Sequence, residues 1–261
     1  MSTAVRDNVT MLRRSLLHAR RYPSLTLNLL LTPVMLLLLF VYVFGNVMSA
    51  GIAGGHADRA DYVAYLVPGI LLMTVGMTSL GTAVSVATDM TEGIIARFRT
   101  MAISRASVLT GHVIGSVIQT VLALAVILGL GVAIGFRPDA SPVEWLAAVA
   151  LMALVSLALT WIAVGIGLVS PNAEGASNLG MPLTMLPLLS SAFVPVDAMP
   201  AGFRWFAEYQ PFSPVIETLR GLLLGTGIGT KNAALALGWC VALTVLGYLW
   251  SKASFNREPR R

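Results

Sequence analysis

Six long apolar stretches constrain the fold of this chain more than any other feature of its sequence. A helix of about 20 apolar residues crosses the roughly 30 Å hydrocarbon core of a bilayer. Only helices or closed barrels satisfy the backbone polar groups at that depth. The stretches predict an all-α polytopic membrane protein, with six transmembrane helices in a single domain over residues 1–261. The six expected spans are residues 24–48, 62–87, 106–135, 143–169, 176–196 and 232–251.

The composition agrees with this class and excludes several others. Hydrophobic residues make up 56% of the chain and charged residues only 11%, unlike an ordinary soluble domain. The net charge of +5 does not indicate nucleic-acid binding, because the basic residues stand at the ends of apolar stretches rather than among stacking aromatic residues. The single cysteine, Cys240, excludes an intrachain disulfide, and the three scattered histidines lack metal-ligand spacing. We therefore expect no catalytic residue, metal site or cofactor in this chain.

Both ends of the chain are basic. Residues 3–21 alternate apolar side chains with five arginines, a pattern typical of an amphipathic helix lying on anionic headgroups. Positive charge favours the cytoplasmic side of a membrane. We therefore expect an N-terminal interfacial helix over residues 3–21, with the N- and C-termini both in the cytoplasm of a multi-pass cell-membrane protein.

Residues 214–229 are apolar enough to suggest a further crossing, but they contain Glu217 and Arg220. If this stretch does not cross, 12 of the 17 basic residues lie on the inner side, whereas a crossing would place the basic C-terminus outside. The charge distribution therefore predicts an outer re-entrant helical hairpin over residues 201–229. Glu217 and Arg220, three residues apart, would share one helix face there.

A charged, amphipathic segment at residues 88–105 separates the second and third expected spans. Read as a helix over residues 91–101, it places four apolar side chains on one stripe and turns its arginines away. Thr91 would cap the first turn, with Asp89 and Glu92 at the positive end of the helix dipole. Such a helix fits a protein groove or a lipid surface; the alternative is a solvated loop between two membrane helices. The stripe consists of Ile94, Ile95, Phe98 and Met101.

The same segment resembles the first cytoplasmic loop of type-2 ATP-binding-cassette (ABC) export permeases, in the daunorubicin-resistance permease branch. The resemblance rests on Glu92-Gly93, on residues 97–105 (Arg-Phe-Arg-Thr-Met-Ala-Ile-Ser-Arg) and on Gly111. The family usually carries proline where this chain has Ala102, so the turn after the helix is expected to be softer here. Residues 191–195, 199–200, 210–214 and 220–221 also resemble the family's outer hairpin.

The resemblance implies the transmembrane permease subunit of an ABC exporter for amphipathic drugs or lipids. In such a complex, two permease chains, identical or closely paralogous, assemble in membrane lipid with two copies of a cytoplasmic ATPase subunit. ATP and Mg would be bound by that partner, because Gly221 to Lys231 has Thr230 where a phosphate-binding loop needs glycine. The chain itself is then not an enzyme.

Three sets of candidate site residues follow from these expectations. The substrate path between permease copies would use uncharged polar groups beside an adaptable apolar one; ordinary helix packing is the competing role for the same residues. Glu217 and Arg220 would form the outer gate. The candidates for the path are Thr74, Met77, Thr78, Ser190 and Ser191. The candidates for coupling to the ATPase are Glu92, Gly93, Ile94, Ile95, Arg97, Phe98, Arg99 and Met101.

Two other functions remain open from the sequence. An exporter of polysaccharide or lipid-linked glycan would use the same scaffold with a continuous channel. A membrane scaffold or lipid-modifying enzyme belongs to a different class, and the enzyme would need converging acid, base or metal-binding groups.

Overall fold

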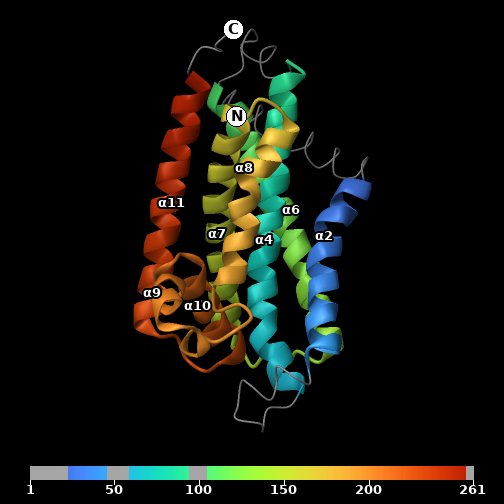
Figure 1. Cartoon of the computed structure of the whole chain (residues 1–261), viewed down its shortest axis with the longest axis vertical. Helices are drawn as coiled ribbons and strands as arrows, with labels where there is room; N and C mark the ends of the chain where they lie inside the picture. The colour runs from blue at the N-terminus through green and yellow to red at the C-terminus, as the bar shows by residue number, and fades with distance from the viewer. Residues whose placement is uncertain (1–22, 46–58, 94–104, 257–261) are drawn as a thin grey trace.

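The computed structural model describes residues 23–45, 59–93 and 105–256, and side chains from Leu30 onward outside a few helix ends (Figure 1). These parts are helical and contain no strand, which confirms the all-α class. The expected interfacial helix at residues 3–21 and most of the expected coupling helix lie outside the described residues.

The described helices follow the apolar stretches of the sequence. The long ones are α4 (Arg59–Thr91), α6 (Arg105–Ile134), α7 (Pro142–Val169) and α11 (Thr230–Asn256). The shorter ones are α2 (Pro23–Leu38), α8 (Ala173–Met185), α9 (Ala201–Tyr209) and α10 (Phe212–Leu224). Three short helical turns complete the order: the π-helical η1 (Leu39–Val43) and the 3-10 turns η2 (Leu186–Leu189) and η3 (Val196–Ala198).

Four of these helices are long and apolar enough to cross a membrane, namely α4, α6, α7 and α11. They overlap the second, third, fourth and sixth expected spans. The other two expected spans correspond to shorter pieces. α2 passes directly into the π-helical turn η1, and α8 contains Pro182 and ends in the 3-10 turn η2, which contains Pro187. Proline inside a helix removes a backbone hydrogen bond, which explains why the stretch from α8 to η2 is not one regular helix.

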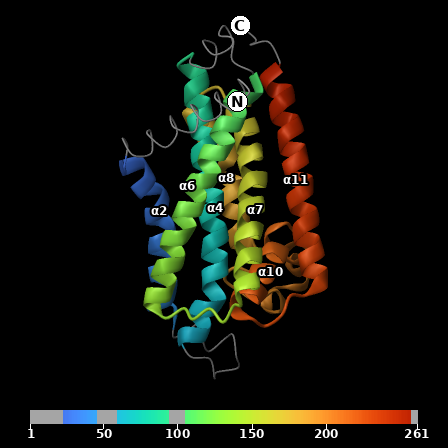
Figure 2. The same cartoon turned by 180° about the vertical axis from the view of Figure 1, so that it is seen from behind.

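The bundle is built around α4, which contacts α2, α6, α7, α8 and α10. Its most apolar 18-residue window is 78% buried and that of α7 is 67% buried, against 22% for α6 and 17% for α11. α4 and α7 therefore form the centre, while α6 and α11 present apolar surface outward. Figures 1 and 2 show α8 and α2 beside α4 on one face, and α9 and α10 gathered at the end where α11 begins.

Small residues allow the central helices to approach closely. A Cβ atom at Gly76 of α4 would overlap the carbonyl oxygen of Leu183 in α8, and one at Gly167 of α7 would lie 2.6 Å from the carbonyl oxygen of Ala83 in α4. Between α7 and α11, the Ser251 hydroxyl donates to the carbonyl oxygen of Trp161 at 2.8 Å. Close backbone approach at small residues and hydrogen bonds between helices are the usual means of packing in a membrane, because the hydrophobic effect does not drive helices together in lipid.

The helix ends have local causes. Ser141 and Glu144 form a reciprocal capping box at the start of α7, with Pro142 in the first turn. The Asn172 side chain accepts the Gly175 N–H at the start of α8. α10 stops at Gly225, whose φ of +63° suits glycine far better than any other residue.

We expect Gly76→Ala to destabilise the bundle by about 1–3 kcal/mol, because the added methyl group forces α4 and α8 apart. Gly129→Ala is the matched control, since a Cβ at Gly129 in α6 meets nothing within 4 Å. Alanine also favours a helix over glycine by up to about 1 kcal/mol. Thermal unfolding of the purified chain in detergent measures both. Equal midpoints for the two variants would contradict this account of the α4–α8 contact.

Candidate functional site

A group of polar contacts lies where α10 meets α4, at the end of the bundle that carries α9 and α10 (Figure 1). Arg220 is at its centre, and its side chain is only 11% exposed. Its Nη1 donates to Glu217 Oε1 at 2.6 Å, and its Nη2 donates to the carbonyl oxygens of Ser191 at 3.0 Å and Tyr65 at 3.2 Å. One guanidinium group thus joins α10, α4 and the chain that follows η2.

Tyr65 holds the same guanidinium from a second direction. Its ring centroid lies 3.8 Å from Arg220 Cζ, a cation–π contact. Its hydroxyl donates to the Ser191 carbonyl oxygen at 2.9 Å. That carbonyl therefore accepts two hydrogen bonds from side chains, in a stretch where the backbone is not helical.

Two further side chains form hydrogen bonds with the backbone at the end of η2 and just after it. Gln210 Nε2 donates to the carbonyl oxygen of Leu189 at 2.6 Å, and the Ser191 N–H donates to Ser213 Oγ at 3.1 Å. Backbone groups outside a helix need such protein partners wherever water is excluded. We call this set the Arg220 cluster; its members are Tyr65, Ser191, Gln210, Ser213, Glu217 and Arg220.

The Arg220 cluster has hydrogen-bonding capacity to spare. Arg220 Nε, Ser191 Oγ and Gln210 Oε1 are buried and have no hydrogen-bond partner among the described residues. Each such group carries a cost as long as it stays unpaired. A rearrangement that offered these atoms a new partner would recover part of that cost.

The candidate outer-gate pair is in contact, as the i, i+3 spacing predicts: Glu217 and Arg220 are 2.6 Å apart. Its role as a gate stays a prediction. Sequence reasoning missed Tyr65, which lies 155 residues from Arg220. No local pattern in the sequence connects them, since only the packing of α4 against α10 brings them together.

Most candidate path residues lie inside the chain. Thr74, Thr78, Ser190 and Ser191 are buried, and only Met77 is half-exposed. The Thr74 hydroxyl donates to the Ile70 carbonyl oxygen at 2.8 Å, and the Thr78 hydroxyl contacts that of Thr120 in α6 at 2.8 Å. In this conformation the four buried residues are packed inside the bundle and do not line an open surface. Their assignment to the path stays a prediction.

The structure corrects the expected start of the coupling helix. Thr91 is the last residue of α4, and its hydroxyl donates back to the Thr88 carbonyl oxygen at 2.9 Å. Asp89 also belongs to α4, and Gly93 adopts a φ of +71° beyond its end. Thr91 therefore closes α4, and the left-handed Gly93 separates α4 from whatever follows. The remaining candidates, from Ile94 to Met101, lie outside the described residues.

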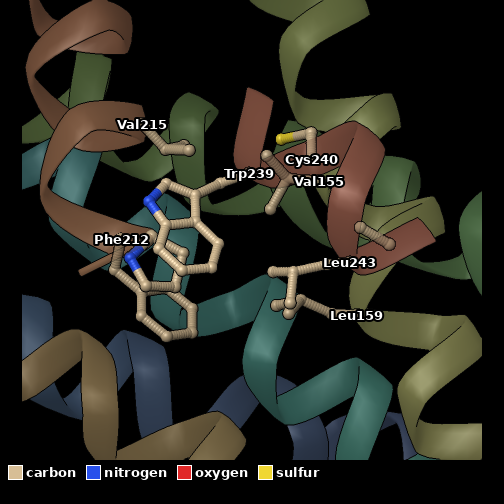
Figure 3. Close-up of a pocket in the computed structure, with 9 residues that line it drawn as sticks. Val155, Leu159, Phe212, Val215, Trp239, Cys240 and Leu243 are labelled. Carbon is tan, nitrogen blue, oxygen red and sulfur yellow. The ribbon is translucent and has the colours of Figure 1, made fainter. Parts of the chain in front are cut away.

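A small apolar pocket lies between α7, α10 and α11 (Figure 3). Its lining includes Val155, Phe212, Trp239 and Cys240, and the Trp239 indole N–H is already donated to the Tyr209 carbonyl oxygen at 3.0 Å. The pocket holds no acid, base or charged group. Among the described residues, no group of three or more His, Cys, Asp or Glu side chains is placed to hold a metal ion.

Comparisons with known proteins find a transporter family and several relatives that align over most of the chain. The family model of the ABC-2 type transporters matches residues 6–224. The daunorubicin resistance ABC transporter permease protein DrrB1 of Streptomyces coeruleorubidus is 30% identical over 228 residues, covering 86% of this chain and 77% of the relative. The probable doxorubicin resistance ABC transporter permease protein DrrC of Mycobacterium tuberculosis is 21% identical, covering 88% and 83%. Nodulation protein J of Rhizobium meliloti is 25% identical, covering 84% and 82%.

We expect Arg220→Ala to lower the stability of the bundle by about 2 kcal/mol or more, because it removes three hydrogen bonds and takes from Glu217 its charged partner. Arg204→Ala is the matched control: Arg204 pairs with Asp197 at 3.0 Å, but its side chain is 43% exposed. Exposed pairs contribute less than about 1 kcal/mol. Thermal unfolding and hydrogen exchange at residues 186–192 measure the effect. Similar behaviour of the two variants would show that the Arg220 cluster does not hold this segment.

Proposed function

The chain belongs to the ABC-2 type transporter family, and from this membership we propose that it is the permease subunit of an ATP-driven exporter of amphipathic drugs or lipids. It is a multi-pass membrane protein of that family. The observation that carries the proposal is the 30% identity with a daunorubicin resistance permease over 86% of the chain. A second drug-resistance permease aligned over 88% of the chain supports the same substrate class.

The energy for transport would come from a separate cytoplasmic ATPase subunit that binds ATP and Mg, in two copies for two permease chains. The family is one of transmembrane subunits rather than catalytic ones. The Arg220 cluster and the apolar pocket likewise offer no nucleophile backed by a base. A permease of this kind converts movement of its partner into movement of its helices.

The proposed topology has six crossings, with α2–η1 and α8–η2 as the first and fifth. Both pieces run alongside the four long helices (Figures 1 and 2). Successive segments alternate in direction, so the start of α2 and the end of α11 lie at the same end of the bundle. We assign that end to the cytoplasm. α9 and α10 then form the outer re-entrant hairpin, and the Arg220 cluster would close the exit.

The second permease chain would pack on the face that carries α2 and α8. Leu31 and Met35 of α2 and Leu179, Met181 and Met185 of α8 are exposed there, each by more than two-fifths. Adaptable methionine side chains suit an interface that changes between states. Movement of α4 together with α6 away from α8 would open a path between the two chains beside Thr74, Thr78, Ser190 and Ser191.

The topology predicts that Arg204→Cys and Lys231→Cys, each in a Cys240→Ser background, are labelled from outside intact cells by a membrane-impermeant maleimide. α9 and the start of α11 are joined by the Lys231–Glu208 pair at 2.8 Å, so both positions should lie on one side. Thr91 is exposed at the C-terminal end of α4, at the end of the bundle far from α9 and α10. Thr91→Cys should therefore be labelled only after permeabilisation. Labelling of Arg204→Cys and Lys231→Cys from opposite sides would refute the re-entrant hairpin.

The function itself predicts that cells producing this chain with its ATPase subunit accumulate less of a fluorescent anthracycline, and that Phe98→Ala removes this effect. An aromatic anchor in a protein pocket contributes a few kcal/mol to association, so its loss should weaken binding of the ATPase subunit roughly 10- to 100-fold. Ile94→Asp should act in the same direction. Drug accumulation and co-purification measure the two effects.

Arg99→Ala is the control for the coupling segment, because a charge at the rim of an interface mainly changes encounter rate and salt dependence. Membrane insertion of all variants should be normal. Full partner affinity and export in both Phe98→Ala and Ile94→Asp would overturn the coupling assignment. An assembled, ATP-hydrolysing complex that leaves drug accumulation unchanged would overturn the drug substrate and leave glycan export as the alternative to test.

A further inference from the structure

Three polar pairs line the contact between α4 and α6. Thr78 Oγ1 lies 2.8 Å from Thr120 Oγ1, the Thr82 hydroxyl donates to Ser116 Oγ at 2.7 Å, and Asp89 Oδ2 lies 3.2 Å from His112 Nε2. We call this set the α4–α6 seam. Its members are Thr78, Thr82 and Asp89 of α4 with His112, Ser116 and Thr120 of α6.

The spacing of the seam follows the helix period. His112, Ser116 and Thr120 are four residues apart along one face of α6. On α4, Thr82 follows Thr78 by four residues, and Asp89 completes three turns from Thr78. As the numbers rise on α4, those of the partners on α6 fall, as two antiparallel helices in one fixed register require. The pairs therefore define both the rotation and the axial position of the two helices.

The seam is buried. The four hydroxyl-bearing residues are at most 8% exposed, and the side chains of Asp89 and His112 are 12% and 15% exposed. Ser116 Oγ also lies 3.4 Å from Thr160 Oγ1 of α7, so the contacts continue into the centre of the bundle. The hydroxyls of Thr78, Thr82 and Thr120 also donate to backbone carbonyl oxygens of their own helices. Separating α4 from α6 would break the three interhelical contacts in an apolar surrounding, where polar contacts are strong.

The position of the seam matters for the proposed coupling. α4 ends at Thr91 and α6 begins at Arg105, so these two helices flank the coupling segment. Asp89, in the last turn of α4, is two residues from that end. If the two helices were free to splay apart here, a pull on the segment would be absorbed locally. If they are locked, the same pull moves both helices together.

We propose that Asp89 and His112 are positioning residues that lock the cytoplasmic ends of α4 and α6, so that the pair moves as one body when the ATPase subunit displaces the coupling segment. This inference rests on the proposed function. The hydroxyl pairs Thr82–Ser116 and Thr78–Thr120 extend the lock toward the middle of the bundle. The seam thereby carries movement at the coupling segment to the part of α4 that includes Thr74 and Thr78.

The lock is tested first without transport, by distances between spin labels at Thr91→Cys and Ile114→Cys in a Cys240→Ser full-length chain. Both positions are exposed. We expect His112→Ala to broaden the distance distribution, and His112→Gln, whose amide N–H still reaches Asp89, to restore it. A second label pair at Ala60→Cys and Ala133→Cys, at the other end of the two helices, should stay unchanged in every variant.

The second measurement is the amount of drug moved per ATP hydrolysed by the reconstituted complex. We expect a several-fold loss in His112→Ala, with unchanged affinity for the ATPase subunit and recovery in His112→Gln. Thr82→Val, nearly the same shape without the hydroxyl, should give a smaller loss and serves if His112→Ala does not fold. Ser85→Ala, at an exposed position of α4, is the control and should behave as the unaltered chain.

Wild-type distance distributions in both His112→Ala and Thr82→Val would overturn the lock. A broadened distribution with an unchanged transport-to-ATP ratio would overturn the positioning role, because the seam would then serve stability alone. If the unaltered complex showed no ATP-driven transport, the proposed function would fail by itself, and the label distances would still decide whether the seam locks α4 to α6.

Discussion

The structure depends on one constraint: polar groups removed from water by apolar surroundings must find partners within the protein. The constraint acts strongly on the stretch after η2, because its backbone leaves the helix at Ser190. Arg220, Tyr65, Gln210 and Ser213 supply the hydrogen bonds that a continuous helix would have supplied. The position of α10, which we propose to be re-entrant, is thus tied to the irregular end of α8–η2 by these hydrogen bonds.

The same constraint organises the interior of the bundle around α4. Toward α8 and α7, glycine allows backbone contact, as at Gly76 and Gly167. Toward α6, the contact is made by paired hydroxyl groups and by Asp89 with His112. The first kind of contact is close and apolar, whereas the second fixes register through directional bonds. A permease that must change shape needs some contacts that slide and others that hold, and α4 carries both kinds on different faces.

The Arg220 cluster contacts α4 at Tyr65, near the start of the helix. The α4–α6 seam runs from Thr78 to Asp89, near its end, and one continuous helix connects the two sets of contacts. The seam includes Asp89, two residues from the end of α4, and the Arg220 cluster lies at the proposed exit. Energy delivered at one end would therefore reach the other through α4 and the helices packed on it. Three buried polar atoms of the Arg220 cluster have no hydrogen-bond partner among the described residues. In the proposed gate, these atoms could form new hydrogen bonds when the cluster rearranges.

The sequence by itself determined the membrane class, the approximate limits of α4, α6, α7 and α11, and the contact of Glu217 with Arg220. Each of these depends on composition or on spacing within a few residues, which a helix converts directly into position. Tertiary structure alone decided that Tyr65 meets Arg220, that Thr74 and Thr78 face inward, and that Asp89 pairs with His112. Those outcomes depend on how each helix is rotated against neighbours far away in the chain, and no local pattern carries that information. The end of α4 at Thr91 was also decided by the tertiary structure, since the helix continues about one turn beyond residue 87, where the apolar stretch ends.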